Sequence, residues 1–274
     1  MHEMLALTNL GLFVLHFASA SYVFINRDDV PDRFRKIKIF RQQVKPAGQG
    51  SMEYGFSNEL VMTVDLVLLI ASFFLITSLF HLAYFLGRDS WYNGFLNKGW
   101  NPVRWIEYSV TATIMVVILA LTATVQDAST LLMLVCTTAM IMLLGGCIER
   151  AILSGDKLQS FALLKIGWIL QLAVFFVIGL AFVTTIRAVN DKLAAEQAKE
   201  VIPDWVYAIL VAELVFFSCF GFVSIAQFVR KFVQRKETSF VSYEKTYHLL
   251  SLLAKLTLGW VFFIGATKSA NAKK

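Results

Sequence analysis

The sequence Ser251-Leu-Leu-Ala-Lys255-Leu-Thr-Leu-Gly-Trp260 places a lysine in the middle of an apolar run long enough to cross a bilayer. A bare ammonium at that depth costs at least about 2.5–3.5 kcal/mol, so Lys255 needs an anionic partner, a polar cavity or a covalent use. Burial also favours the neutral amine, which is the form that reacts with a carbonyl to make a Schiff base. A lysine that snorkels to the interface from near a helix end is the alternative, and the apolar residues on both sides disfavour it.

The composition is that of a polytopic membrane protein. The chain has 274 residues, of which 57% are hydrophobic and 16% charged, and its mean hydropathy is +0.64. These values are too apolar for an ordinary soluble domain. The net charge of +6 would suggest a nucleic-acid partner in a soluble chain, but the basic residues lie mostly between apolar segments. We therefore expect them to meet membrane lipid headgroups, with no nucleic-acid partner.

Seven apolar segments are each near or above the length of about 20 residues that a membrane-spanning helix requires. They are residues 4–25, 58–86, 102–125, 130–148, 161–187, 204–229 and 243–267. No internal repeat or low-complexity tract interrupts them. The sequence therefore predicts an all-α fold, a single seven-transmembrane-helix bundle over residues 1–274. The cysteines Cys136, Cys147 and Cys219 lie inside the apolar segments and are expected to behave as small hydrophobic residues.

The loop at 26–57 is the one loop long enough to form a substructure. Lys36-Ile37-Lys38-Ile39-Phe40 alternates polar and apolar residues, and Pro46-Ala-Gly-Gln-Gly50 is typical of a turn. We expect a β-hairpin outside the bilayer whose apolar face packs on the bundle or on a second subunit. A solvated basic loop is the alternative.

The charges of the loops indicate the orientation only weakly. Leaving Lys255 aside, 11 Lys and Arg residues fall on the side of the amino terminus and 13 on the other side. The positive-inside rule therefore leans slightly toward an external amino terminus.

The third segment offers an anionic partner for the lysine. Asn101 and Pro102 are typical of a helix N-cap and first helical position, which places Glu107 one turn inside. We interpret Glu107 as the counterion of a cation at Lys255, and an ion pair with Arg104 on the same helix is the alternative. At 1.5 Å per residue, Glu107 lies about 8 Å and Lys255 about 15–18 Å into their helices. The pairing therefore requires the reach of the lysine and a stagger of the helices.

Two histidines, His16 and His81, lie within the first two apolar segments. An intramembrane histidine is more often part of the packing, but imidazole is also the side chain best suited to accept a proton near neutral pH. Neighbouring hydroxyl residues predict a small hydrated pocket near Glu107. They are Ser78, Ser109, Thr111 and Thr113.

Three further charges, Asp65, Lys165 and Glu213, fall within hydrophobic segments. Glu213 is deep in the sixth segment, where it could form a structural pair or line an ion path. The sequence leaves both readings open.

The run Arg104-Trp105-Ile106-Glu107-Tyr108-Ser109, together with Ser251, Lys255 and Trp260, resembles the heliorhodopsins, a branch of the microbial rhodopsins. The resemblance covers nearly the whole chain. It includes the seven helices, the long first loop, a histidine on each of the first two helices, and a serine four residues before the lysine where pumps carry aspartate.

The resemblance implies that Lys255 binds all-trans retinal as a protonated Schiff base, with Glu107 as its counterion and Ser251 as a hydrogen-bonding neighbour. It implies that Tyr108, Phe220 and Trp260 wall the chromophore. A polar cavity that accepts the proton would contain His16, His81, Ser109 and Arg104. It also implies all-trans to 13-cis photoisomerisation, a slow photocycle, a cytoplasmic amino terminus with an extracellular carboxyl terminus, and a homodimer to which the first loop contributes.

A light sensor is the function that these residues favour. Ser251 leaves Glu107 as the apparent sole anion near the Schiff base, which disfavours net ion pumping. We expect an altered shape of the bundle that a signalling partner reads. No metal-ligand spacing, nucleophile motif or phosphate loop indicates an enzyme.

Two alternatives stay open at this stage. The first is a light-gated proton or cation channel, motivated by Glu213. The second is a retinal-free receptor or transporter in which Lys255 and Glu107 form a buried salt bridge.

Overall fold

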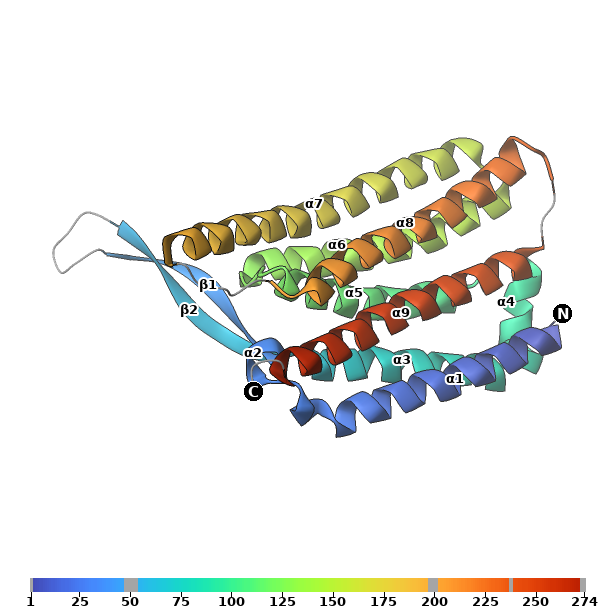
Figure 1. The fold of residues 1–274 in the computed structure, drawn as a ribbon. Coiled ribbons are helices and arrows are strands. Elements are labelled where there is room, and N and C mark those ends of the chain that lie inside the picture. Colours follow the sequence, from blue (N-terminus) through green and yellow to red (C-terminus); the bar gives the residue numbers. More distant parts are fainter. Residues whose placement is uncertain (1, 47–53, 197–201, 237–238, 272–274) are drawn as a thin grey trace.

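A computed structural model of the chain describes residues 2–46, 54–196, 202–236 and 239–271. In these ranges seven helices are long and apolar enough to cross a membrane, which confirms the predicted bundle. They are α1 (His2–Ile25), α3 (Leu66–Leu86), α5 (Pro102–Thr122), α6 (Ala128–Ser154), α7 (Lys157–Glu196), α8 (Asp204–Phe232) and α9 (Phe240–Asn271). Figure 1 shows them running roughly parallel to one long axis, with the amino terminus at one end and the carboxyl terminus near the other.

Helix α5 lies in the interior of the bundle. In the most apolar stretch of α5, two-thirds of the residues are buried. In α7 and α8 most residues are not buried, and their apolar side chains face the surroundings of the protein. Helix α5 packs against α3 and α6. Helix α9 packs against α8 and also contacts α1 and α3. Because α5 is surrounded by other helices, charged residues on it are held away from both lipid and water.

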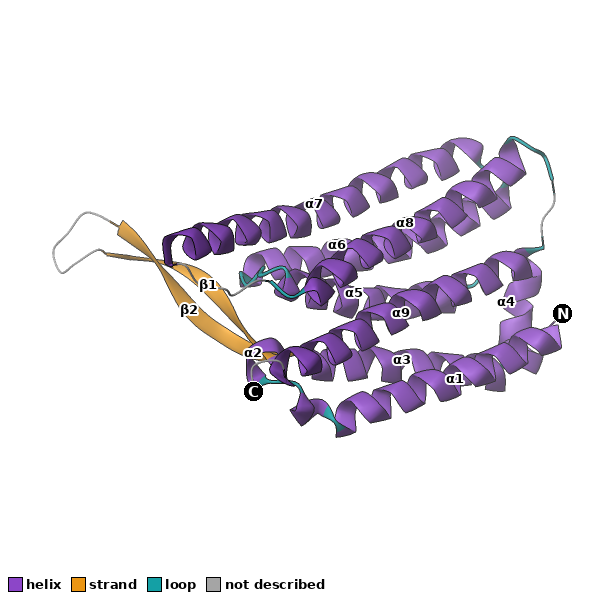
Figure 2. Ribbon diagram, in the orientation of Figure 1, coloured by secondary structure: helices purple, strands orange, loops and turns teal. Residues whose placement is uncertain are grey.

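The predicted β-hairpin is confirmed. Strand β1 (Lys36–Pro46) pairs antiparallel with β2 (Tyr54–Asp65), with Ile37 opposite Val64 and a register shift between Ile39 and Phe40. The hairpin extends beyond the end of the bundle opposite the amino terminus (Figures 1 and 2). Residues 47–50, which carry most of the predicted turn, lie outside the described residues.

The second predicted span, 58–86, is wrong at its start, because residues 58–65 belong to β2 and the helix begins at Leu66. Asp65 is therefore the N-cap of α3 and not a charge inside an apolar helix. Its Oδ1 accepts hydrogen bonds from the backbone N–H groups of Val67 (3.0 Å) and Leu68 (3.2 Å). The error has a physical cause: β2 is rich in apolar residues, so hydropathy alone continues from the strand into the helix.

Short helical elements also occur outside the long helices. A 3₁₀ turn η1 (Arg27–Asp29) and helix α2 (Asp32–Arg35) precede the hairpin, and a π-helical turn η2 (Arg88–Tyr92) and helix α4 (Asn93–Lys98) connect α3 to α5. The expectation that no loop besides 26–57 forms a substructure is therefore wrong. Gly99, at φ 78°, ends α4 in the left-handed region that glycine adopts without strain.

Candidate functional site

Lys255 and Glu107 meet in the interior of the bundle. Lys255 Nζ donates to Glu107 Oε1 at 2.8 Å and to Ser251 Oγ at 2.9 Å. Both charged residues are only 2% exposed. Because each buried charge is the other's partner, neither is left uncompensated.

The difference in depth between the two residues is resolved by the stagger of their helices. Asn101 caps α5, as predicted, and its Oδ1 accepts from the backbone N–H groups of Val103 (3.1 Å) and Arg104 (3.3 Å). Helix α9 begins beside α4, where Val241 shares a buried apolar cluster with Leu96. It therefore starts before α5 does along the bundle axis, which brings Lys255 level with Glu107.

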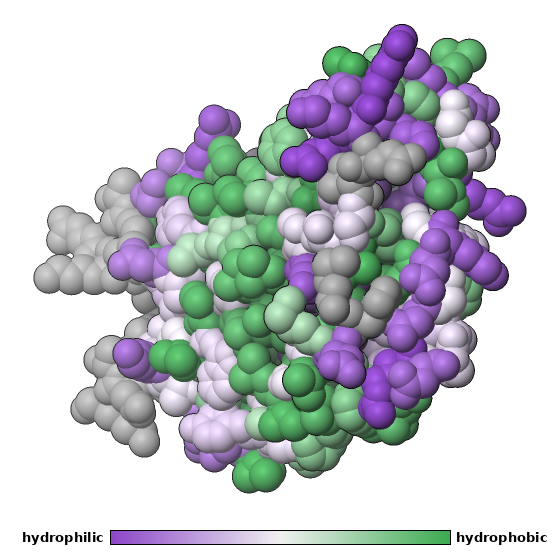
Figure 3. Space-filling view, turned by 90° about the vertical axis from the view of Figure 1, so that its right-hand side faces the viewer, coloured by the Kyte–Doolittle hydropathy of each residue, from purple (hydrophilic) through white to green (hydrophobic). Residues whose placement is uncertain are grey.

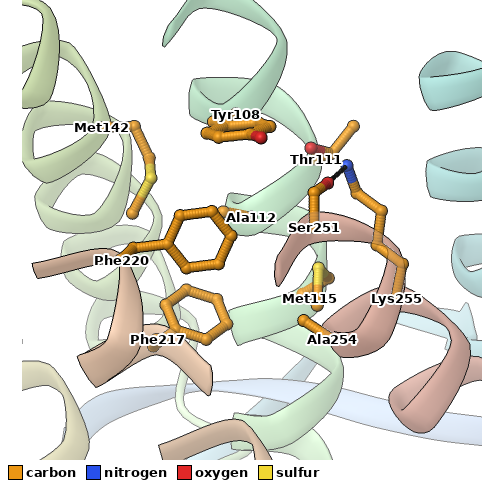
Figure 4. Close-up of a pocket in the computed structure, with 10 residues that line it drawn as sticks. All are labelled: Tyr108, Thr111, Ala112, Met115, Met142, Phe217, Phe220, Ser251, Ala254 and Lys255. Atoms are coloured by element: carbon orange, nitrogen blue, oxygen red, sulfur yellow. Dashed lines mark hydrogen bonds between the residues drawn. The ribbon is translucent and has the colours of Figure 1, made fainter. Parts of the chain in front are cut away.

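An apolar cavity adjoins the lysine, between α5, α6, α8 and α9. It is lined by Tyr108, Thr111, Ala112, Met115, Met142, Phe217, Phe220, Ser251, Ala254 and Lys255. Figure 4 shows the rings of Phe217 and Phe220 facing the Tyr108 and Met115 side of the cavity, with Lys255 at one end. Its volume of about 20 Å³ is close to the space of a single water molecule.

A second cavity, of about 50 Å³, lies toward α7. Met142 and Phe220 line both cavities, so rotation of these two side chains would join them. Trp168 Nε1 and Gln171 Nε2, which belong to lining residues of the second cavity, are buried without a hydrogen-bond partner in the described part of the chain. The two spaces are adjacent, and the residues that line them are mainly apolar.

Only some of the residues that were predicted to surround the chromophore line this cavity. Tyr108, Phe220 and Ser251 line the cavity next to Lys255, but Trp260 does not. The Trp260 ring instead packs against Tyr22 of α1, at 5.4 Å between ring centroids. Five residues beyond Lys255 correspond to about 140° around an α-helix, which explains why Trp260 faces elsewhere.

The two predicted histidines are in contact. The rings of His16 and His81 stack at 5.8 Å, and His81 Nδ1 is hydrogen-bonded to Asn9 Oδ1 at 2.8 Å. A third imidazole, His248, lies edge-on to His81 at 5.1 Å. Sequence reasoning missed His248, although it lies seven residues before Lys255, a spacing that puts both on one helix face.

Arg104 belongs to a separate buried network. Its guanidinium donates to Glu149 and to Glu244, and Trp105 Nε1 donates to Glu149 Oε2 at 2.9 Å. Asn101 Nδ2 also donates to Glu244 Oε1, at 2.7 Å. The alternative of an ion pair between Arg104 and Glu107 on one helix is therefore wrong. Sequence spacing did not indicate Glu149 or Glu244, because both are far from Arg104 along the chain.

The histidines and the arginine network touch at one point. His248 Nε2 lies 3.5 Å from Glu244 Oε1, which is bound by Arg104 through its other oxygen. Arg104 thus lies beside the histidine cluster and is not a member of it.

The four hydroxyl residues expected near Glu107 satisfy carbonyls of their own helices. These hydrogen bonds run from Ser78 to Leu75, from Ser109 to Ile106, from Thr111 to Glu107 and from Thr113 to Ser109. Thr111 lines the cavity beside Lys255, but Ser109 is half-exposed. The structure does not bring Ser109 to the histidine cluster.

Of the remaining predicted charges, Glu213 is fully buried and Lys165 is exposed. Both carboxylate oxygens of Glu213 lack a hydrogen-bond partner within the residues that the structure describes. The Lys165 ammonium lies over the Phe161 ring at 4.8 Å.

We expect Arg104→Met to lower the stability of the protein strongly. Removal of one partner of a buried ion network leaves two carboxylates uncompensated and typically costs about 3–5 kcal/mol. Thermal unfolding in detergent, followed by circular dichroism, measures the effect. Arg150→Met is the control, because Arg150 is exposed and its guanidinium lies over the Trp100 ring at 5.5 Å. Equal melting temperatures for the two variants would contradict a stabilising role for the network.

Comparisons with known proteins identify a family by sequence and similar folds among solved structures. A sequence profile of the family Heliorhodopsin matches residues 5–267. No curated protein matches the sequence. The crystal structure of a thermophilic rhodopsin is 13% identical, with a TM-score of 0.62, and the match covers 99% of this chain and 96% of that one.

A second similar structure is the light-driven proton pump LR (Mac) from Leptosphaeria maculans. It is 14% identical, with a TM-score of 0.56, and the match covers 98% of this chain and 95% of that one. At these identities the two structures show the fold alone.

Proposed function

This chain belongs to the heliorhodopsin family and is a retinal-binding, light-responsive membrane protein, and we propose that it acts as a light sensor without net ion pumping. The observation that carries the proposal is the pair of Lys255 and Glu107, buried beside an apolar cavity. The proposal makes Lys255 Nζ the point of covalent attachment of all-trans retinal. When bound, retinal supplies the absorption of visible light and the all-trans to 13-cis isomerisation that starts a slow photocycle.

The residues around the attachment point have distinct roles in this proposal. Glu107, at 2.8 Å from Nζ, balances a positive charge there, and Ser251 accepts a hydrogen bond from the same atom. Met115, Phe217 and Phe220 exclude water from the cavity and would hold the polyene. The site thereby keeps a cation stable in an apolar environment.

A proton released from Nζ would be held by the histidines. Imidazole accepts a proton near neutral pH, and His16 Nδ1 is buried without a hydrogen-bond partner among the described residues. Toward the amino-terminal end, Glu149 and Glu244 are both bound by Arg104. These two carboxylates are therefore not free to carry the proton onward. This arrangement favours return of the proton to Nζ and disfavours net pumping.

The orientation and the oligomeric state are part of the same proposal. On the basis of the family resemblance, we propose that the amino terminus lies in the cytoplasm and the carboxyl terminus outside. Leu60, Val61 and Met62 of β2 are about half-exposed, which supports a homodimer contact through the hairpin. A signalling partner would recognise the altered conformation of the bundle.

Reconstitution with the chromophore tests the proposal. The chain is expressed with all-trans retinal, its visible spectrum is recorded before and after hydroxylamine, and the same cells are voltage-clamped under illumination. A bleachable band without current is the expected result. Absence of a band would favour a retinal-free receptor or transporter with a structural Lys255–Glu107 pair.

A light-gated proton or cation channel is the second candidate, and the observation in its favour is Glu213, which is fully buried and has no partner among the described residues. If light evokes a current, we expect Glu213→Gln to remove most of it, because the variant cannot bind or transfer a cation at that position. Asp204→Asn, at the exposed start of the same helix, is the control. A current that is unchanged in Glu213→Gln would exclude this path.

A further inference from the structure

A large cavity opens at the amino-terminal end of the bundle, away from the site described above. Its volume is about 430 Å³, and it lies between α4, α6, α8 and α9. Four of its lining residues are cations, Lys98, Arg230, Lys231 and Lys236. Figure 3 looks onto this end of the molecule and shows hydrophilic side chains gathered along its upper and right-hand edges.

Separate parts of the chain supply these cations. Lys98 is the last residue of α4, and Arg230 and Lys231 lie in the last turn of α8. After α8, Arg235 adopts a positive φ of 52°, and the backbone N–H of Lys236 donates to the Arg230 carbonyl at 3.0 Å. This turn folds the chain back and brings Lys236 to the cavity wall.

Among the described residues of the wall, Glu149 is the one carboxylate, and it does not pair with Lys98, Lys231 or Lys236. Glu149 already accepts hydrogen bonds from the Arg104 guanidinium and from Trp105 Nε1, on the inner side of the cavity. No ion pair to Lys98, Lys231 or Lys236 is found in the part of the chain that the structure describes. Three lysines of the wall thus carry a positive charge that no described carboxylate pairs with.

A polar group with an unfilled hydrogen bond also borders this cavity. The hydroxyl of Tyr243, a lining residue from α9, is buried and has no partner among the described residues. A phenol O–H can donate to an anionic oxygen. The cavity thus combines several cations with the buried Tyr243 hydroxyl, a hydrogen-bond donor without an acceptor among the described residues.

We propose that this cavity binds a phosphate-class anion, from a soluble phosphate compound or from a phospholipid headgroup. A phosphate group carries up to two negative charges and three acceptor oxygens, which match cations converging from separate elements. The volume falls within the range of small-ligand sites. Nothing in the proposal depends on retinal or light, so it goes beyond the sensor function.

Binding of inorganic pyrophosphate to the purified full chain tests the proposal. Calorimetry in maltoside micelles, which contain no phosphate, is expected to show saturable binding. Lys231→Gln and Lys236→Gln should each weaken it about tenfold, because each removes one charge-assisted hydrogen bond. Lys157→Gln is the matched control, since Lys157 is exposed at the same end of the bundle but does not line the cavity.

Tyr243→Phe is the variant that separates binding from folding. It removes a hydroxyl that has no partner among the described residues, so the melting temperature should not fall, while pyrophosphate affinity drops several-fold. Tyr207→Phe, on the exposed surface of α8, is the control. Equal affinities for Tyr243→Phe and Tyr207→Phe, or for the lysine variants and Lys157→Gln, would overturn the proposal.

Nanodiscs distinguish the two sources of the phosphate group. Competition with pyrophosphate by discs containing phosphatidylglycerol, but not by discs of phosphatidylcholine alone, would identify a lipid headgroup. Pyrophosphate binding that is unaffected by either lipid would identify a soluble anion. Absence of saturable binding to both pyrophosphate and phosphatidylglycerol would refute the site and leave the sensor proposal untouched.

Discussion

Lys255→Ala abolishes the visible absorption band of the protein supplied with all-trans retinal. This outcome is expected because Lys255 Nζ is the amine that borders the apolar cavity, and alanine leaves no nucleophile for the chromophore. Absorbance after addition of retinal measures the effect, with hydroxylamine bleaching to identify a covalent chromophore. The loss should be complete rather than partial.

Lys165→Ala is the control for this variant, because Lys165 also lies within a hydrophobic helix but is exposed on α7. It should keep the band at the parent wavelength. Circular dichroism of Lys255→Ala separates loss of the chromophore from loss of the fold. A folded Lys255→Ala protein that still carries a bleachable band would refute the attachment site.

Glu107→Gln moves the visible band to longer wavelength. The Glu107 carboxylate lies 2.8 Å from Lys255 Nζ, where Coulomb's law at an effective dielectric constant of about 20 gives about 6 kcal/mol of attraction. Neutralisation removes this stabilisation from the ground state, in which the positive charge is nearest Nζ, so the excitation energy falls. Spectra recorded over a pH series measure the shift.

Glu213→Gln is the matched control, because Glu213 is also a buried glutamate but lacks a cationic partner among the described residues. Its band should stay within a few nanometres of the parent. An unshifted maximum in Glu107→Gln would exclude Glu107 as the counterion, whatever the result for Lys255.

Much of the candidate site could be predicted from local sequence. Asn101 before Pro102 predicted the start of α5, and the structure confirms it. The placement of Lys255 in an apolar run predicted a buried partner, and Glu107 is 2.8 Å away. The alternation of residues 36–40 predicted a strand, which is also present. Each of these inferences uses features within one segment, where spacing along the chain is equivalent to spacing in the structure.

Other features depended on contacts between distant segments. The apolar residues of β2 made hydropathy extend the second span across 58–65, and only the pairing with β1 separates strand from helix. Arg104 was expected beside Glu107 or the histidines, yet it binds carboxylates from α6 and α9. Trp260, which the family resemblance assigns to the chromophore wall, packs against Tyr22 of α1.

The sequence alone was sufficient for the membrane-protein class, the seven helices and the position of Lys255 inside an apolar helix. Hydropathy and helix periodicity decide these features, and both are properties of a single segment. The tertiary structure alone decided which buried charges pair, which rings line the cavity, and that cations from α4, α8 and the turn after α8 converge on one cavity. Such features depend on the rotation and stagger of helices packed against one another, which no single helix contains.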